Sequence, residues 1–209
     1  LTGFVRDLAA AHPGRFELEL ATNFPELWAG HPAAPRLVPK PRSQPQDRRY
    51  YKAHYGNGMT QSKVETVHYA GWFHRDFRMK TGLEVPVTEP RGELILGPHE
   101  RGRLPGLPER YWVLAGGGKS DFPVKIWPPE YWQMVVDDLA ALGIPCVQVG
   151  RATPGLLNHV QPKLRGVVDY VNRTSLRQMA QLVAHADGVL AQVSFPMHLA
   201  AALDRPCVV

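Results

Sequence analysis

Three loops in the second half of the sequence carry residue types that could hold an anion. The first is Gly116–Asp121, which reads Gly-Gly-Gly-Lys-Ser-Asp. Consecutive glycines let backbone N–H groups approach a phosphate closely. The loop contains only the G-G-K-S part of the Walker pattern, and Pro123 and Pro128 follow too soon for Lys119 to begin a long helix. A P-loop ATPase is therefore not expected.

The other two loops supply a lysine and a helix start. Lys125 lies just before Pro128, which suits the first turn of a helix, and it could reach a phosphate over the glycine loop. An exposed lysine beside a packing tryptophan is the alternative. Ser194 can cap the next helix and Pro196 suits its first turn, so the N–H groups and positive dipole end of that helix would favour an anion. His198 could donate to a phosphate oxygen, unless it is merely satisfied locally.

A parallel sheet is needed to bring these loops together, and the pattern from residue 111 onward predicts one. Short apolar runs alternate with helical periodicity, which is typical of βαβ units covered on both faces. Ligands of such sheets bind at the carboxyl ends of the strands, where the three loops fall. The expected strands are 111–115, 145–149, 166–168, 188–191 and 206–209, and the expected helices are 128–142, 175–185 and 196–203.

The first half is less regular. We expect helices at 1–11, 24–28 and 67–83 and strands at 16–20, 36–38 and 93–96. In the helix 67–83 the apolar spacing turns five side chains inward, and Gly82 closes the helix. These inward side chains are Tyr69, Trp72, Phe73, Phe77 and Met79. A stretch rich in turn formers precedes residue 108, so we expect two α/β lobes, 1–104 and 105–209.

The composition is that of an ordinary globular protein, with 44% hydrophobic and 21% charged residues among 209. It contains no apolar run of about 18 residues that could span a membrane. Cys146 and Cys207 are expected to be small buried hydrophobes in a reducing compartment. The chain starts at Leu1 and stops at Val209 within an apolar run, which suggests a piece of a longer protein.

The net charge of +5 is concentrated in a proline-interrupted loop between Arg36 and Lys52. Its basic residues are Arg36, Lys40, Arg42, Arg48, Arg49 and Lys52, against Asp47 alone. Such a loop suits an anionic partner, although a solvated loop without a partner has the same pattern. A nucleic-acid-binding module is disfavoured because no aromatic residues interleave on a basic strand face. No H-E-x-x-H or C-x-x-C motif occurs, so no metal site is expected.

Taken in order, the segments Lys125–Pro128, 174–179, 186–189 and 194–202 resemble glycosyltransferase family 9, the heptosyltransferase-like enzymes that use ADP-heptose in building lipopolysaccharide. The resemblance is close from 111 to 209 and looser before. It implies a GT-B-like α/β fold with two Rossmann-like lobes and parallel sheets, an acceptor-side lobe at 1–104 and a nucleotide-sugar-binding lobe at 105–209. It also implies inverting, metal-independent transfer of a heptose-like sugar to a glycan or lipopolysaccharide-type acceptor.

Carried over by position, the resemblance assigns Lys125 to the donor phosphate, Thr174 to the base or ribose, and the turn 194–198 to the diphosphate. The implied donor-binding residues are Gly117, Gly118, Ser120, Asp121, Lys125, Thr174, Ser194, Pro196, Met197 and His198. Arg42, Arg48, Arg49 and Lys52 would form an acceptor-side basic loop that steers an anionic, lipid-linked acceptor. The resemblance places the catalytic base in a glycine–aspartate turn before Leu1, so no base is assigned here.

The donor would be ADP-heptose or another nucleotide-diphosphate sugar, with no cofactor and no nucleic-acid partner. A cytoplasmic protein follows, with peripheral contact at the inner membrane left open. Two positions depart from the family pattern, because Val193 and Phe195 stand where an aspartate and a glycine are usual. The aspartate would hold sugar hydroxyls, so a different donor sugar or a non-catalytic nucleotide-binding scaffold is the alternative function.

Overall fold

The computed structural model describes residues 1–39, 64–66, 68–121, 123–154 and 159–209. The chain divides into two compact units, Leu1–Ile95 and Leu96–Val209. The roles of an acceptor-side lobe and a nucleotide-sugar lobe, expected for 1–104 and 105–209, stay predictions. The basic residues Arg42, Arg48, Arg49 and Lys52 lie outside the described residues.

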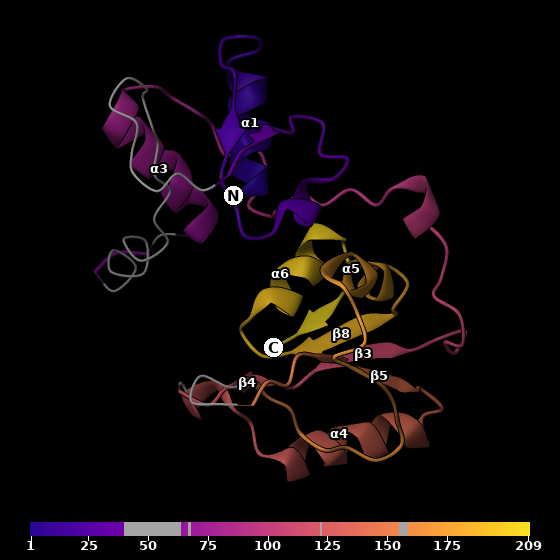
Figure 1. Ribbon diagram of the computed structural model, residues 1–209. Helices are drawn as coiled ribbons and strands as arrows, with labels where there is room; N and C mark the ends of the chain where they lie inside the picture. Colours follow the sequence, from indigo (N-terminus) through magenta and orange to yellow (C-terminus); the bar gives the residue numbers. More distant parts are fainter. Residues whose placement is uncertain (40–63, 67, 122, 155–158) are drawn as a thin grey trace. The chain divides into compact units, whose positions relative to one another are not determined.

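The second unit is built on a five-stranded sheet with the order β7-β5-β3-β8-β9, in which every neighbouring pair is parallel. The strands are β3 (Trp112–Ala115), β5 (Cys146–Gly150), β7 (Val167–Val171), β8 (Gly188–Ala191) and β9 (Cys207–Val208). Helix α4 (Pro129–Ala141) covers one face, and α5 (Leu176–Ala184) and α6 (Phe195–Ala202) cover the other (Figure 1). The expected parallel sheet with helices on both faces is confirmed.

The side chains of β3, β5 and β8 explain why these strands lie in the middle of the sheet. Val113, Val147 and Val189 lie on β3, β5 and β8, and each is fully buried. Branched apolar side chains on both faces are the usual composition of a strand that helices cover on both sides.

The order of the strands reverses direction at β3. From β3 the chain steps outward through β5 to β7, and then returns to place β8 on the opposite side of β3. The two strands are in register to their ends, where Ala115 pairs with Ala191. In an open parallel sheet, this reversal leaves a crevice at the carboxyl ends of the two strands, where ligands bind.

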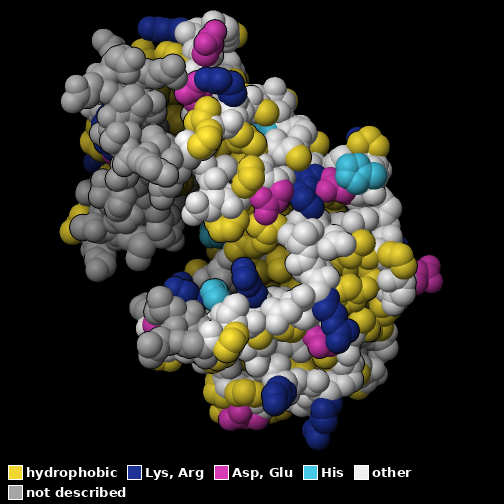
Figure 2. All heavy atoms as spheres, in the orientation of Figure 1, with side chains coloured by type: hydrophobic (Ala, Val, Ile, Leu, Met, Phe, Trp, Pro, Cys, Tyr) yellow, Lys and Arg dark blue, Asp and Glu magenta, His cyan; other side chains and the backbone are white. Residues whose placement is uncertain are grey.

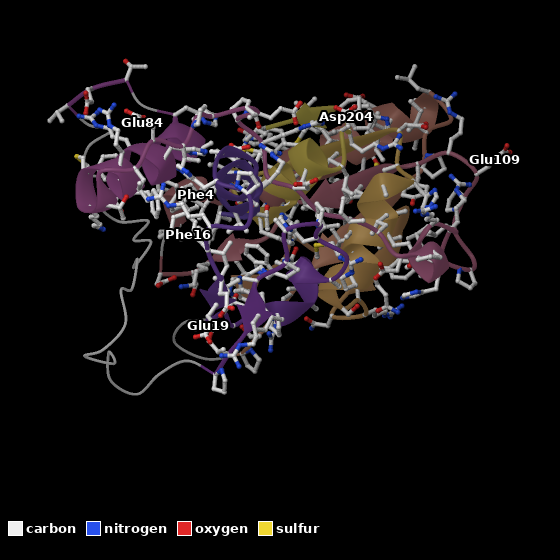
Figure 3. All side chains as sticks on the ribbon, turned by 90° about the horizontal axis from the view of Figure 1, so that it is seen from above. Phe4, Phe16, Glu19, Glu84, Glu109 and Asp204 are labelled. Carbon is white, nitrogen blue, oxygen red and sulfur yellow. The ribbon has the colours of Figure 1, made fainter. Side chains whose placement is uncertain are left out.

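The first unit is smaller and its described sheet has two parallel strands, β1 (Glu19–Leu20) and β2 (Arg36–Leu37). Its helices are α1 (Thr2–Ala11), the short 3-10 helix η1 (Pro25–Trp28) and α3 (Tyr69–Thr81). Phe4 on α1 is labelled in Figure 3. Its ring packs 5.2 Å, centroid to centroid, from the rings of both His74 and Phe77 on α3. These contacts form the core of this unit, together with Leu8 and Trp28.

A buried carboxylate ties three segments of the first unit together. Asp7 on α1 receives hydrogen bonds from the Nε of Arg6, from the hydroxyl of Thr88 and, at 2.9 Å, from Nε2 of His74 on α3. Burial by itself would raise the pKa of Asp7, but these hydrogen bonds outweigh it and lower the pKa below its ordinary value.

Two expectations for local structure are wrong, and a third is confirmed only in part. The segment 93–96 is not a strand; the backbone N–H of Glu93 donates to the hydroxyl of Thr2 instead, at 2.8 Å. Met79 is 58% exposed, because it lies two residues after the buried Phe77 and helix geometry turns it to another face. The strand expected at 16–20 is formed only at Glu19–Leu20.

Gly82 ends α3 with a φ of 73°, as expected. No helix among the described residues has the length and apolar character needed to cross a membrane.

Candidate functional site: the carboxyl ends of β3 and β8

The glycine loop that follows β3 is packed tightly by the protein's own side chains. A β-carbon on Gly116 would lie 2.9 Å from the ring of Trp132, and one on Gly118 would lie 2.9 Å from Ile126. Any larger residue would have to displace these neighbours. The glycines therefore let the loop lie close to α4 and to the segment that carries Lys125.

Two hydrogen bonds link this loop and Lys125 to the turn after β8. Lys125, at the end of the 3-10 helix η3 (Pro123–Lys125), donates from Nζ to the carbonyl oxygen of Val193 at 3.3 Å. The side chain of Gln192 donates from Nε2 to the carbonyl oxygen of Gly116 at 3.2 Å. The structure thus brings together, at the strand reversal, the three loops that the sequence singled out.

Ser194 does not cap α6, contrary to expectation. Its backbone stands at the N-cap position, but its hydroxyl donates to the carbonyl oxygen of Gln192 at 3.0 Å and accepts no hydrogen bond from the helix. Pro196 lies in the first turn, as expected, and has no N–H. The side chain of Ser194 therefore satisfies none of the backbone N–H groups in the first turn of α6. His198, one turn into the helix, is exposed.

The difference between two serines tests this arrangement. Ser175 caps α5 through a capping box with Gln178, with its Oγ 3.1 Å from the backbone nitrogen of that residue. Ser175→Ala should lower the free energy of unfolding by about 1 kcal/mol, whereas Ser194→Ala should change it by less than about 0.5 kcal/mol. Urea denaturation of the two variants measures both values. Equal losses would contradict the hydroxyl geometry at Ser194.

The remaining predicted residues lie at the same edge of the sheet but farther apart. Asp121 forms an ion pair with Lys119, with Oδ2 3.6 Å from Nζ. Ser120 lies between them and is partly buried, as are Gly117 and Met197. Thr174 follows β7 and is half-buried, and β5 separates β7 from β3 in the sheet.

Two glutamines at this edge were missed by the sequence reasoning. Gln192 directly follows β8, and a polar side chain at the carboxyl end of a predicted strand is a signal that would have identified it. Gln161 follows β6 (His159–Val160), which pairs antiparallel with β4 (Gly118–Lys119). Strands this short leave no periodicity in the sequence, so nothing pointed to Gln161.

The segment before β3 is anchored by a charge pair. Glu100 ends the 3-10 helix η2 (Pro98–Glu100) and is 9% exposed. Its Oε1 accepts from Nε of Arg177 on α5 at 2.7 Å, and its Oε2 accepts from Nη2 of Arg177 and from the backbone N–H of Gly97. The hydrogen bond from Arg177 is the largest cause that lowers the pKa of Glu100, to about 2.

This pair predicts a pH-dependent contribution to stability. Because the pKa of Glu100 is lower in the folded state than its ordinary value of 4.5, the stabilisation is complete above pH 4.5 and is lost as the pH falls toward 2. Glu100→Gln should therefore lower the free energy of unfolding by about 2 kcal/mol at pH 7, and the gap to the wild type should close between pH 4.5 and 2. Urea denaturation across this range measures it, with exposed Glu109→Gln as the control. A gap that stays constant with pH would contradict the pairing.

Apolar side chains are exposed beside Lys125. Val193 is 54% exposed and Phe195 is 37% exposed, on either side of Ser194.

On the face shown in Figure 2, the described Lys and Arg side chains are scattered among acidic and apolar ones rather than gathered in one patch.

The site offers little to a metal ion. Among the described residues, no group of three or more His, Cys, Asp or Glu side chains is placed to hold one. The two cysteines are separate, Cys146 being buried and Cys207 partly so. Burial raises the pKa of Cys146 to about 11, so this thiol stays protonated at neutral pH.

The structure is similar to solved glycosyltransferases. The iron-containing dodecameric glycosyltransferase TibC from enterotoxigenic E. coli H10407 matches with a TM-score of 0.65 and 20% identity, over 100% of this chain and 54% of that one. The E. coli heptosyltransferase WaaC, solved with ADP-2-deoxy-2-fluoro heptose, matches with a TM-score of 0.63 and 20% identity, over 99% and 82%. E. coli ADP-heptose lps heptosyltransferase II matches with a TM-score of 0.62 and 16% identity, over 99% and 78%.

These likenesses show the fold, which is the α/β, GT-B-like fold that the sequence predicts. The chain spans about half the length of TibC. No curated protein matches the chain. The model of glycosyltransferase family 9 (heptosyltransferase) matches residues 72–209, well over half of the chain. The chain therefore belongs to glycosyltransferase family 9.

Proposed function

We propose that this chain is part of a glycosyltransferase that transfers a heptose-like sugar from a nucleotide-diphosphate donor to a glycan or lipopolysaccharide-type acceptor. The observation that carries the proposal is the hydrogen bond from Lys125 to the carbonyl of Val193. It holds a cation at the first turn of α6, at the strand reversal between β3 and β8. Family membership supplies the reaction class.

The donor would bind with its diphosphate at this edge. A cationic Nζ and the N–H groups of a helix end are the groups that stabilise phosphate oxygens. Gly118 and Met197 would line the same place, with Ser120 and Asp121 in the neighbouring loop and Thr174 toward the nucleoside. WaaC has been solved with ADP as well as with a fluorinated ADP-heptose, which supports an adenosine donor here.

The mechanism follows from where charge develops. Negative charge builds on the diphosphate as the sugar–phosphate bond breaks, and donors already aimed at that charge lower the barrier. Lys125 and the first turn of α6 would do this, and His198 would add a donor from an exposed position. The acceptor oxygen attacks the anomeric carbon from the face opposite the diphosphate, so the bond to the diphosphate breaks and the configuration is inverted. The proton of the acceptor hydroxyl passes to a base on that face. None of the described residues is assigned as that base.

Iron is named for TibC but does not fit the described residues of this chain. The steps proposed here use Lys125, backbone N–H groups and histidine. On the acceptor side, the loop with Arg42, Arg48, Arg49 and Lys52 is proposed to steer an anionic acceptor by long-range attraction, with peripheral membrane contact as one way to meet it.

A nucleotide-binding protein without transferase activity is the second candidate. Val193 and Phe195 favour it, because exposed apolar groups beside the diphosphate turn cannot hydrogen-bond sugar hydroxyls. Such a protein would keep the diphosphate site formed by Lys125 and α6 and lose only the contacts to the sugar.

Isothermal calorimetry of the chain with ADP, UDP and GDP tests the diphosphate site. Selective binding of ADP would support the proposal and identify adenine as the nucleobase of the donor. ADP-heptose should compete with ADP for the same site. The second candidate would be favoured if the chain binds ADP but the complete protein transfers no sugar from ADP-heptose to a lipopolysaccharide acceptor. Binding of none of the three diphosphates would contradict both.

A further inference from the structure

A side-chain amide lies across the ends of β3 and β5. The pairing of β6 with β4 sets Val160 opposite Gly118, and Gln161 follows next in the chain. A β-carbon on Gly117 would lie 1.9 Å from Nε2 of Gln161, and one on Gly150 would lie 2.4 Å from the same atom. The amide therefore rests against the α-carbons of two glycines at the carboxyl edge of the sheet.

The orientation of the amide is fixed by one hydrogen bond. Nε2 of Gln161 donates to the carbonyl oxygen of Arg151 at 3.1 Å. The flipped amide would set two oxygen atoms against each other, so the nitrogen must face Arg151. This leaves Oε1 buried and without a hydrogen-bond partner among the residues that the structure describes.

A buried acceptor without a partner is unfavourable, and native proteins usually satisfy it. Here the acceptor lies beside Gly117, in the loop proposed to hold the donor diphosphate. The terminal torsion of glutamine is soft, so a small rotation can tilt Oε1 toward a ligand while Nε2 keeps its hydrogen bond to Arg151. A nucleoside offers two kinds of donor for it, ribose hydroxyls and an amino group on the base.

We propose that Gln161 determines nucleotide specificity, through a hydrogen bond that its Oε1 accepts from a hydroxyl or amino group of the bound nucleoside diphosphate. The inference rests on the proposed function and adds a residue that is not among the donor-binding residues implied by the resemblance to the family. Its chemistry is selective because an acceptor of this kind favours nucleotides that present an N–H or O–H at that place.

Removing the acceptor should weaken binding. Gln161→Met has similar length and no hydrogen-bonding amide, and it should bind ADP about 10-fold more weakly than the wild type in calorimetry, as expected for one lost hydrogen bond. Gln133→Met is the matched control. Gln133 also bonds loop backbone, from Nε2 to the carbonyl oxygen of Arg165, but it lies on α4. It should leave ADP affinity unchanged.

Analogues that lack single donors identify the group that Gln161 contacts. The probes are 2′-deoxy-ADP, which lacks the 2′-hydroxyl, 3′-deoxy-ADP, which lacks the 3′-hydroxyl, and inosine diphosphate, which lacks the amino group of the base. One of them should bind the wild type about 10-fold more weakly than ADP does, and should show no such loss with Gln161→Met, because the two changes remove the same bond. A merely structural role for Gln161 would weaken all four ligands equally.

The outcomes separate this inference from the proposed function. If the wild type binds ADP and Gln161→Met binds it equally well or more tightly, the inference is overturned and the diphosphate site stands. An equal loss for every ligand also overturns it. Binding of no diphosphate by the wild type overturns the proposed function, and the role of Gln161 with it. Thermal unfolding of Gln161→Met and Gln133→Met confirms that both are folded at the temperature of the titration.

Discussion

Lys125→Ala should lower the affinity for ADP by about 10- to 100-fold, since a hydrogen bond to a charged group contributes about 1.5–3 kcal/mol. The lysine sits at the strand reversal, where its Nζ lies 3.3 Å from the carbonyl oxygen of Val193. A diphosphate bound at the first turn of α6 would meet this cation directly. Calorimetry at low and high salt measures the effect, and the difference between wild type and variant should shrink as salt screens the charge.

Two further variants give this result its meaning. Lys163→Ala removes an exposed lysine of the same unit that lines a groove along α4, and it should leave ADP affinity unchanged. Lys125→Gln keeps a donor for the carbonyl of Val193 but removes the charge, so it should bind ADP almost as weakly as Lys125→Ala does. Wild-type affinity in Lys125→Gln would mean that the side chain only positions the turn. Wild-type affinity in both Lys125 variants would mean that the diphosphate does not bind at this edge of the sheet.

The alternation of strands and helices after residue 111 was predictable because local and tertiary signals agree there. Val113 and Val147 lie in short apolar runs that only a covered sheet can bury, and both are fully buried. The helix α5 begins where Ser175 and Gln178 form the capping box. Loops that follow parallel strands lie at the same edge of the sheet, so the sequence could predict that Lys125 lies near the turn at Ser194. It could not predict the hydrogen bond between them.

The errors arise where another hydrogen bond replaces the one that a local rule predicts. A serine before a helix usually caps it, but the hydroxyl of Ser194 bonds back to Gln192, whose own side chain is held by Gly116. The segment 93–96 carries a short apolar run that resembles a strand, yet it has no partner strand among the described residues. The hydroxyl of Thr2 accepts the N–H of Glu93 instead. Gln192 and Gly116, like Thr2 and Glu93, are too far apart in sequence to leave a local pattern.

The role of Gln161 was hidden for a different reason. Its place depends on the pairing of Gly118 with Val160, two residues brought together by a strand only two residues long. The glycine run was visible in the sequence and suggested room for a phosphate. The structure shows that part of this room, over Gly117, is taken by the amide of Gln161.

Trp132→Ala should lower the free energy of unfolding by about 3–5 kcal/mol, the largest loss of stability expected for any single variant discussed here. Trp132 on α4 is 5% exposed and packs in the core beside Leu114 and Cys146. Its ring also stands 5.1 Å, centroid to centroid, from Trp127 and lies against Gly116. Alanine would leave a cavity under the glycine loop, because neighbours on strands cannot collapse into it. Urea denaturation measures the loss.

The same variant links the core to the site. With the ring gone, the loop at Gly116 loses the surface against which it rests, so ADP affinity should fall even at temperatures where the variant is folded. Trp132→Phe should restore most of the stability, because the indole nitrogen of Trp132 has no hydrogen-bond partner in the described part of the chain and nothing polar is lost with it. Met134→Ala, at a side chain that is 60% exposed on the same helix, should cost less than about 0.5 kcal/mol. A loss below about 1 kcal/mol for Trp132→Ala would mean that α4 does not support the loop, and the glycines would then need another reason for their place beside Lys125.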